Sequence, residues 1–167
     1  MTMTKTKVHD VDELRRRAQK LRLYGLLSRW GKLCTEAWVP ELLELEEQER
    51  ARRSREYRIK NAKVGSFKPI ADFDWKHPKK IDRGQIEDLF DLDFIKEATN
   101  VVFVGPNGIG KSMISQNLAY QAIIHGHTVR FTSASDMLND LSGLDGSSLK
   151  QRLKRYVNPK LLVIDLC

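Results

Sequence analysis

The stretch Asn100-Val101-Val102-Phe103-Val104-Gly105-Pro106-Asn107-Gly108-Ile109-Gly110-Lys111-Ser112 decides the fold of this chain. Its second part matches G-x-x-x-x-G-K-[ST], a loop that joins a strand to a helix and cradles phosphates. Glycines in such a loop allow positive φ and expose backbone N–H groups to phosphate oxygens. In this pattern Lys111 bridges the β- and γ-phosphates of ATP, and the Ser112 hydroxyl ligates Mg²⁺. The motif therefore predicts an ATP site formed by Gly105, Pro106, Asn107, Gly108, Ile109, Gly110, Lys111 and Ser112.

Strands and helices alternate from this stretch onward. The run Val101–Val104 is β-branched and aromatic throughout, which predicts a strand buried on both faces. The same reasoning predicts two further strands, and the loops between elements are short. We expect right-handed crossovers and a parallel sheet, and hence an α/β fold. The expected elements are strands at 101–104, 128–132 and 161–164, and helices at 111–124, 135–141 and 147–156.

The third of these strands ends in an acid, Asp165. A carboxylate in this position can hold the Mg²⁺ of a phosphate-binding-loop enzyme, so we predict Ser112 and Asp165 as metal ligands. The next residue, Leu166, cannot accept a proton from an attacking water. We therefore predict no catalytic residue and expect ATP hydrolysis by this chain to be impaired.

The N-terminal part of the chain reads differently. Apolar residues recur at helical spacing from Val11 to Leu21, and residues 41–63 contain neither Gly nor Pro. We predict a helical, basic region at 1–63, a connector at 64–84 and a partial phosphate-binding-loop ATPase domain at 85–167 that opens with a helix at 85–97. Phe73 and Trp75, in the connector, either line an adenine pocket or pack in the core.

Positive charge is concentrated in this region. The net charge is +7, from 29 Lys and Arg against 22 Asp and Glu, and residues 50–68 contain one acid, Glu56. Such a run is either a solvated helix face or a surface that contacts nucleic-acid phosphates. A second patch, Lys150, Arg152, Lys154 and Arg155, leaves the same alternatives open. The predicted DNA-binding residues are Arg50, Arg52, Arg53, Arg55, Arg58, Lys60 and Lys63.

Composition excludes several other classes of protein. The chain has 167 residues, and its 41% hydrophobic share provides for a packed core. The sequence contains no window of 18 uncharged apolar residues, so we expect no transmembrane helix and no membrane as a partner. Residues 1–17 lack the apolar core of a secretory signal. The two cysteines, Cys34 and Cys167, are too far apart in sequence for a metal motif and suit a reducing cytoplasm.

Several stretches resemble the IstB-like ATP-binding proteins, a branch of the AAA+ ATPases close to the DnaC-like helicase loaders. The resemblance runs through nearly the whole chain. It rests on Leu21-Arg22-Leu23-Tyr24-Gly25, the charged segment Glu44–Lys63, Ile70-Ala71-Asp72-Phe73-Asp74, the stretch Asn100–Ser112, and Gly126–Thr132.

The resemblance implies a five-stranded sheet in the order 5-1-4-3-2. In the family, the third strand continues as Ile-Asp-Glu, whereas this chain reads Ile164-Asp165-Leu166-Cys167. We therefore expect a chain truncated after this strand, without strands 4 and 5, so that strand 101–104 lacks a neighbour on either side. Such a half-domain either closes strand 1 against strand 3, or folds poorly, or needs a partner chain.

Three functions remain open at this point. The resemblance implies an ATP-binding helper of DNA transposition, with duplex DNA, the transposase of the same element and further copies of the chain as partners. A helicase-loader-like protein is the second reading. The third is a remnant that binds nucleotide without hydrolysing it, or has no function.

Overall fold

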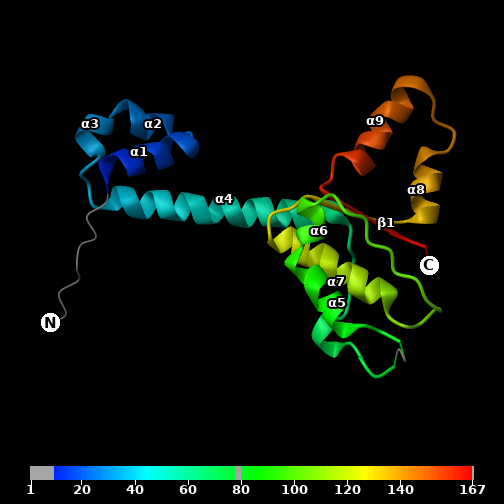
Figure 1. The fold of residues 1–167 in the computed structure, drawn as a ribbon. Coiled ribbons are helices and arrows are strands. Elements are labelled where there is room, and N and C mark those ends of the chain that lie inside the picture. Colours follow the sequence, from blue (N-terminus) through cyan, green and yellow to red (C-terminus); the bar gives the residue numbers. More distant parts are fainter. Residues whose placement is uncertain (1–9, 78–79, 167) are drawn as a thin grey trace. The chain divides into compact units, whose positions relative to one another are not determined.

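The computed structural model describes residues 10–77 and 80–166 (Figure 1). The chain divides into two compact units, residues 1–54 and 55–167. The division falls inside helix α4 (Trp38–Ala62), so each end of α4 is described below with its own unit. Cys167 and the first nine residues, which entered the expectations above, lie outside the described residues. Within the described part of the chain, no helix combines the length and apolar character needed to cross a membrane.

The first unit is a small helical cluster. Asp10 caps its first helix by accepting a hydrogen bond from the backbone N–H of Asp12 at 3.0 Å. Arg17 donates two hydrogen bonds of 2.9 Å to the carboxylate of Glu47 on α4, and this ion pair joins the two helices. The helices before α4 are α1 (Val11–Lys20), α2 (Tyr24–Ser28) and α3 (Trp30–Leu33). Their shared core consists of Leu14, Ala18, Leu21, Leu26, Trp30, Val39 and Leu43.

The second unit is the α/β part of the chain, and its mixed architecture confirms the predicted fold class. Helix α7 starts at Lys111, directly after the phosphate-binding loop, as predicted. The predicted helix at 85–97 is interrupted, because Leu92 is buried with a left-handed backbone of φ +62°. In chain order the elements are η1 (Ile70–Asp72), α5 (Arg83–Asp88), η2 (Leu89–Asp91), α6 (Asp93–Lys96), α7 (Lys111–Ile124), β1 (Val129–Ser133), α8 (Ala134–Leu141), α9 (Gly146–Val157) and β2 (Leu161–Asp165).

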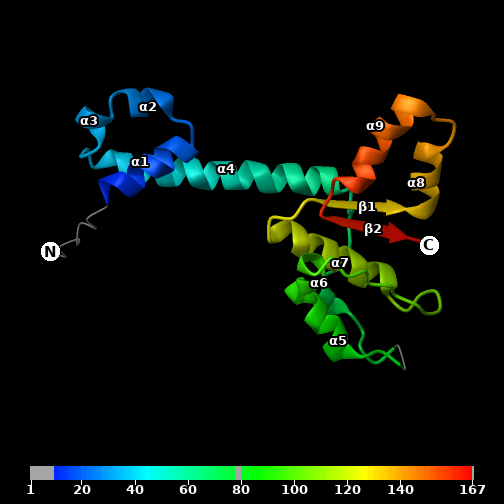
Figure 2. The same ribbon diagram turned by 45° about the horizontal axis from the view of Figure 1, so that its top comes forward.

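The sheet of this unit is a parallel pair, β1 and β2 (Figure 2). Its register pairs Val129 with Leu161 at one end and Ser133 with Asp165 at the other. Side chains alternate along a strand, so every second residue meets α7. Fully buried residues of α7, such as Ile123, close this face together with Val129.

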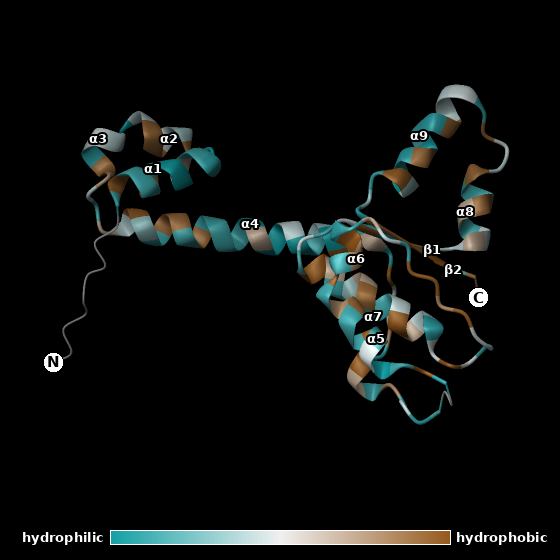
Figure 3. Ribbon diagram, viewed as in Figure 1, coloured by the Kyte–Doolittle hydropathy of each residue, from teal (hydrophilic) through white to brown (hydrophobic). Residues whose placement is uncertain are grey.

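The predicted strand at 101–104 does not form. These residues are extended coil, and the Val102 and Val104 side chains are 78% and 89% exposed (Figure 3). A β-branched run becomes a strand only where a neighbour pairs its N–H and C=O groups, and no described strand lies beside it. Of the three outcomes left open for this half-domain, closure of strand 1 against strand 3 is not observed. Instead, a cavity of about 490 Å³ is lined by residues 101–103 and by residues 161–166.

The connector is fastened to α7 by one buried amide, Asn117. Its Oδ1 accepts a hydrogen bond from the N–H of Ile70 at 2.9 Å. Its Nδ2 donates to the carbonyl oxygens of Lys68 at 2.9 Å and of Met113 at 2.8 Å. Because the side chain is only 8% exposed, water cannot easily replace these bonds. Asn117 therefore holds the connector in place behind the phosphate-binding loop.

We predict that Asn117→Ala lowers the free energy of unfolding by about 2 kcal/mol, because it leaves buried backbone groups without partners. Chemical denaturation followed by circular dichroism measures the change. Gln151→Ala, an exposed position on α9, is the control and should change stability by less than about 0.5 kcal/mol. An equal effect of the two substitutions would contradict the role of Asn117.

Candidate functional site

The predicted phosphate-binding loop spans residues 105–110 and lies mostly on the surface. Gly108 and Gly110 have backbone φ angles of +81° and +91°, values that residues other than glycine rarely adopt. Gly110 is also the N-terminal cap of α7. The first backbone N–H groups of a helix have no partner within it, so α7 presents donors and the positive end of its dipole to the loop.

Gly110 is required for a second reason, the close approach of Phe73. A Cβ on Gly110 would overlap the ring carbon Cε2 of Phe73. Phe73 is buried in one cluster with Ile86 and Ile114, and its ring contacts that of Trp75 in a tilted arrangement, with 4.7 Å between the centroids and 58° between the planes. Of the two roles open for Phe73, the structure supports core packing, and the ring supports the loop from behind.

Lys111 is engaged with the loop itself. Its Nζ donates to the carbonyl oxygens of Gly105 at 2.9 Å and of Pro106 at 2.7 Å. These bonds hold the ammonium group over the loop without a phosphate. A bound phosphate would replace neutral carbonyl acceptors with charged ones, which form the stronger hydrogen bonds.

The structure brings the loop and the predicted second ligand together. Lys111, Ser112 and Asp165 all line the cavity of about 490 Å³ described above. A hydroxyl and a carboxylate are hard oxygen donors of the kind that Mg²⁺ takes, with nucleotide phosphates and water supplying the rest. Among the described residues no cluster of three His, Cys, Asp or Glu could hold a metal alone. The donor set therefore fits Mg²⁺ carried by a nucleotide.

Leu166 follows Asp165 at the end of the described chain, and its side chain is 86% exposed. It packs against nothing that would turn it into a core residue, and it has no group to orient a water molecule. The residue after Asp165, the predicted metal ligand, therefore offers no acid–base chemistry.

Four of the seven basic residues predicted to bind DNA are engaged within the protein. Arg50 donates to the carbonyl oxygen of Leu21, and Arg58 Nε donates to the carbonyl oxygen of Ile123 at 3.4 Å. The other two, Arg52 and Arg53, share one carboxylate, that of Glu49, at 2.7 Å each. Their hydrogen bonds lower the pKa of Glu49 to about 2, so that carboxylate stays charged and offsets the arginines.

Arg55, Lys60 and Lys63 differ from the other four. All three side chains are exposed, and no carboxylate among the described residues forms an ion pair with them. Tyr57, on the same stretch of α4, is 71% exposed and adds an aromatic ring. The C-terminal half of α4 is therefore the part of the basic run whose charge is available to a ligand.

A second cavity contains a residue that the sequence reasoning missed, Arg130. The cavity has a volume of about 590 Å³ and lies beside β1, where Lys63 and Arg155 also line it. The signal in the sequence was a cation between Val129 and Phe131, in the middle of an otherwise apolar strand. Two residues of the second basic patch form ion pairs with Asp140. Arg152 Nη1 lies 2.8 Å from Asp140 Oδ1, and Arg155 Nη1 lies 3.7 Å from Asp140 Oδ2.

Comparison with known sequences gives one family. The sequence model of the IstB-like ATP binding protein family matches residues 14–167. An ATP-binding protein of insertion sequence IS5376 from Geobacillus stearothermophilus is 31% identical over 156 residues, which is 87% of this chain and 62% of that relative.

Two further relatives show the same pattern. An insertion-sequence ATP-binding protein of Mycobacterium tuberculosis is 30% identical over 162 residues, 91% of this chain and 64% of its own length. An ATP-binding protein of insertion sequence IS232 from Bacillus thuringiensis subsp. berliner is 33% identical over 107 residues, 62% of this chain and 43% of its own. The chain thus spans about two fifths to two thirds of the length of these relatives.

We predict that Gly110→Ala destabilises the second unit more than Gly108→Ala. Both substitutions place a side chain at positive φ, at a cost of about 1–2 kcal/mol. Only Gly110 faces Phe73, and the overlap adds about 1–3 kcal/mol, whereas no atom lies within 4 Å of the Cβ position at Gly108. Thermal and urea unfolding of the two variants measures the difference. Equal losses would show that Phe73 does not support the loop.

Proposed function

This chain belongs to the family of IstB-like ATP-binding proteins, and from that premise we propose that it binds ATP with Mg²⁺ and assists DNA transposition on duplex DNA. Its proposed partners are DNA, the transposase of the same element and further copies of the chain. The relatives named above are proteins of insertion sequences, which favours this role over that of a helicase loader.

One observation carries the nucleotide part of the proposal. Lys111 and Ser112 come from the start of α7 and Asp165 from the end of β2, yet all three line one cavity. The backbone of the loop and the dipole of α7 would bind the β- and γ-phosphates. Lys111 would leave its two carbonyl partners for the phosphates, and Ser112 and Asp165 would hold the Mg²⁺ that shields their charge.

The DNA part of the proposal rests on the available charge of α4. Arg55, Lys60 and Lys63 are exposed and form no ion pair with a carboxylate among the described residues. Contacts of this kind neutralise phosphates and release counterions without reading sequence. We propose that this half of α4 lies along a duplex backbone, while Arg52 and Arg53 contribute less because Glu49 offsets them.

Hydrolysis is a separate question from binding. Leu166 stands where the resemblance places a glutamate, and a leucine side chain cannot deprotonate water. We propose that these residues bind ATP without promoting its turnover, and that any hydrolysis uses a group supplied by another chain.

We predict that the purified chain binds a fluorescent ATP analogue in the presence of Mg²⁺ and that Lys111→Ala weakens binding at least tenfold. The loss follows from removing charge-assisted hydrogen bonds worth about 1.5–3 kcal/mol. Lys154→Ala, an exposed lysine of α9, is the matched control and should bind as the unaltered chain does. Equal binding by the Lys111 variant would overturn the site. Phosphate release measured in the same samples, in a Lys111-dependent manner, would contradict the proposal on turnover.

We also predict that the chain binds duplex DNA with strong salt dependence. Arg55→Gln with Lys60→Gln should flatten the plot of log affinity against log salt by about 0.9 for each lost phosphate contact. Arg52→Gln with Arg53→Gln removes the same charge but should flatten it less, because Glu49 already offsets those arginines. Fluorescence anisotropy of a labelled duplex measures both slopes. The opposite ranking of the two double variants would show that ion pairing within α4 does not select the DNA contacts.

A further inference from the structure

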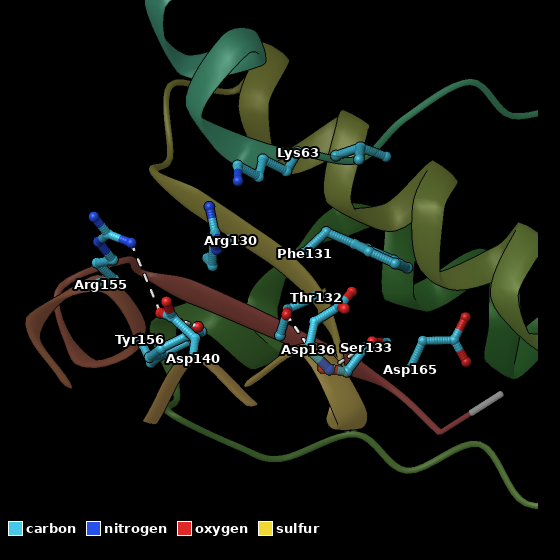
Figure 4. Close-up of a pocket in the computed structure, with 11 residues that line it drawn as sticks. Lys63, Arg130, Phe131, Thr132, Ser133, Asp136, Asp140, Arg155, Tyr156 and Asp165 are labelled. Atoms are coloured by element: carbon cyan, nitrogen blue, oxygen red, sulfur yellow. Dashed lines mark hydrogen bonds and ion pairs between the residues drawn. The ribbon is translucent and has the colours of Figure 1, made fainter. Parts of the chain in front are cut away.

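The cavity beside β1 is distinct from the ATP site proposed above and shares only Asp165 with it. It has a volume of about 590 Å³ and is walled by the end of α4, by β1 and by helices α8 and α9 (Figure 4). Figure 4 shows the cationic ends of Lys63, Arg130 and Arg155 toward one end of the cavity, with Asp140 beside Arg155, and Asp136 and Asp165 toward the other end. Three cations against one carboxylate leave an excess of positive charge at this end, and like charges repel one another unless a further anion lies between them. We propose that this end of the cavity binds a phosphate group of the duplex DNA backbone, held by Lys63, Arg130 and Arg155.

Arg130 is the central residue of this site. Its Nε is buried and has no hydrogen-bond partner in the structure. Buried donors are almost always paired in folded proteins, so the unpaired Nε shows that the guanidinium of this cavity-lining residue lacks a full set of acceptors. The guanidinium lies over the Tyr156 ring, 5.8 Å from its centroid, which fixes its direction. A guanidinium held in this way can bind phosphate oxygens through a planar set of donors.

Asp140 on α8 holds Tyr156, the residue whose ring lies under the Arg130 guanidinium. The Tyr156 hydroxyl donates to Asp140 Oδ2 and Arg152 Nη1 donates to Oδ1, both at 2.8 Å. These hydrogen bonds lower the pKa of Asp140, so the carboxylate is charged and is balanced by Arg152. Arg155 lies farther away, at 3.7 Å from Oδ2, and is half exposed. Asp140 therefore positions Tyr156 and Arg152, while Arg155 forms a longer ion pair with it and also lines the cavity.

Lys63 connects this site with α4. It follows the last residue of the helix, the fully buried Ala62, and its backbone is left-handed with φ +55°. Such a backbone is uncommon for lysine, and strained residues cluster at functional sites. Lys63 also ends the run of available cations on α4. A duplex lying along Arg55 and Lys60 would therefore bring a later phosphate to the mouth of the cavity, and to this extent the inference rests on the proposed DNA binding.

Three variants test the site by duplex anisotropy. Lys63→Asn removes the charge and retains a residue that tolerates positive φ, and Arg155→Gln removes the second charge. Each should weaken duplex binding about three- to tenfold and flatten the salt plot by about 0.9. Arg130→Lys keeps the charge but lacks the Nε donor, and it should weaken binding with an almost unchanged slope. Lys154→Gln is the control, since this exposed neighbour on α9 does not line the cavity.

A second measurement identifies the source of the phosphate. The Nε–Hε signal of Arg130 in the ¹⁵N NMR spectrum of the full chain should shift when duplex is added. Inorganic phosphate and ATP, added separately at the same phosphate concentration, should shift it less. A shift with phosphate or ATP and none with duplex would overturn the assignment to DNA and indicate a small-anion site.

The two proposals fail in different ways. If the chain binds duplex through Arg55 and Lys60, while the cavity variants bind as the control does and the Arg130 signal stays in place, the cavity proposal is wrong and the DNA proposal stands. If the unaltered chain binds no duplex, the proposed DNA function fails, and with it the role of this cavity in DNA binding. Circular dichroism melts of each variant confirm that the comparison is made on folded protein.

Discussion

The packing of α7 against the parallel pair of β1 and β2 is the interaction on which the second unit depends. Ala119, Ala122 and Ile123 are fully buried in this layer, and Val129 meets them from the sheet. Two strands alone are marginally stable in water, so the helix supplies most of the apolar contact that keeps them paired. Because α7 also begins at Lys111, the same packing positions the phosphate-binding loop beside the end of β2.

Parallel pairing places chemistry at one edge of this small sheet. The strands run in the same direction, and the register sets Ser133 beside Asp165. Asp165 consequently lines the cavity with Lys111 on one side and the cavity with Arg130 on the other. The proposed nucleotide site and the proposed phosphate site thus share one residue at the end of β2.

Local geometry decides which cations of the basic run at residues 50–68 are paired with a carboxylate. Arg52 and Arg53 come three and four residues after Glu49 on α4, a spacing at which helical side chains meet, and both pair with it. Arg55 has no acid three or four residues away on α4, and Lys60, four residues after Glu56, forms no ion pair among the described residues. A count of lysines and arginines therefore overstates the positive charge that is left unpaired on α4.

Local pattern determined the elements whose stability is local. The helix after the loop, its start at Lys111, and the glycines at positive φ follow from the motif and from helical spacing, because those preferences act within a few residues. The strands at 129–133 and 161–165 were also predictable within one residue, since each finds the other as its partner. Only the tertiary structure decided the state of residues 101–104. An apolar β-branched run specifies a tendency, and the hydrogen bonds that make a strand must come from a neighbour far away in sequence. The tertiary structure also revealed the orphaned Nε of Arg130 and decided for core packing between the two roles open for Phe73, because burial and unmet hydrogen bonds depend on distant parts of the chain.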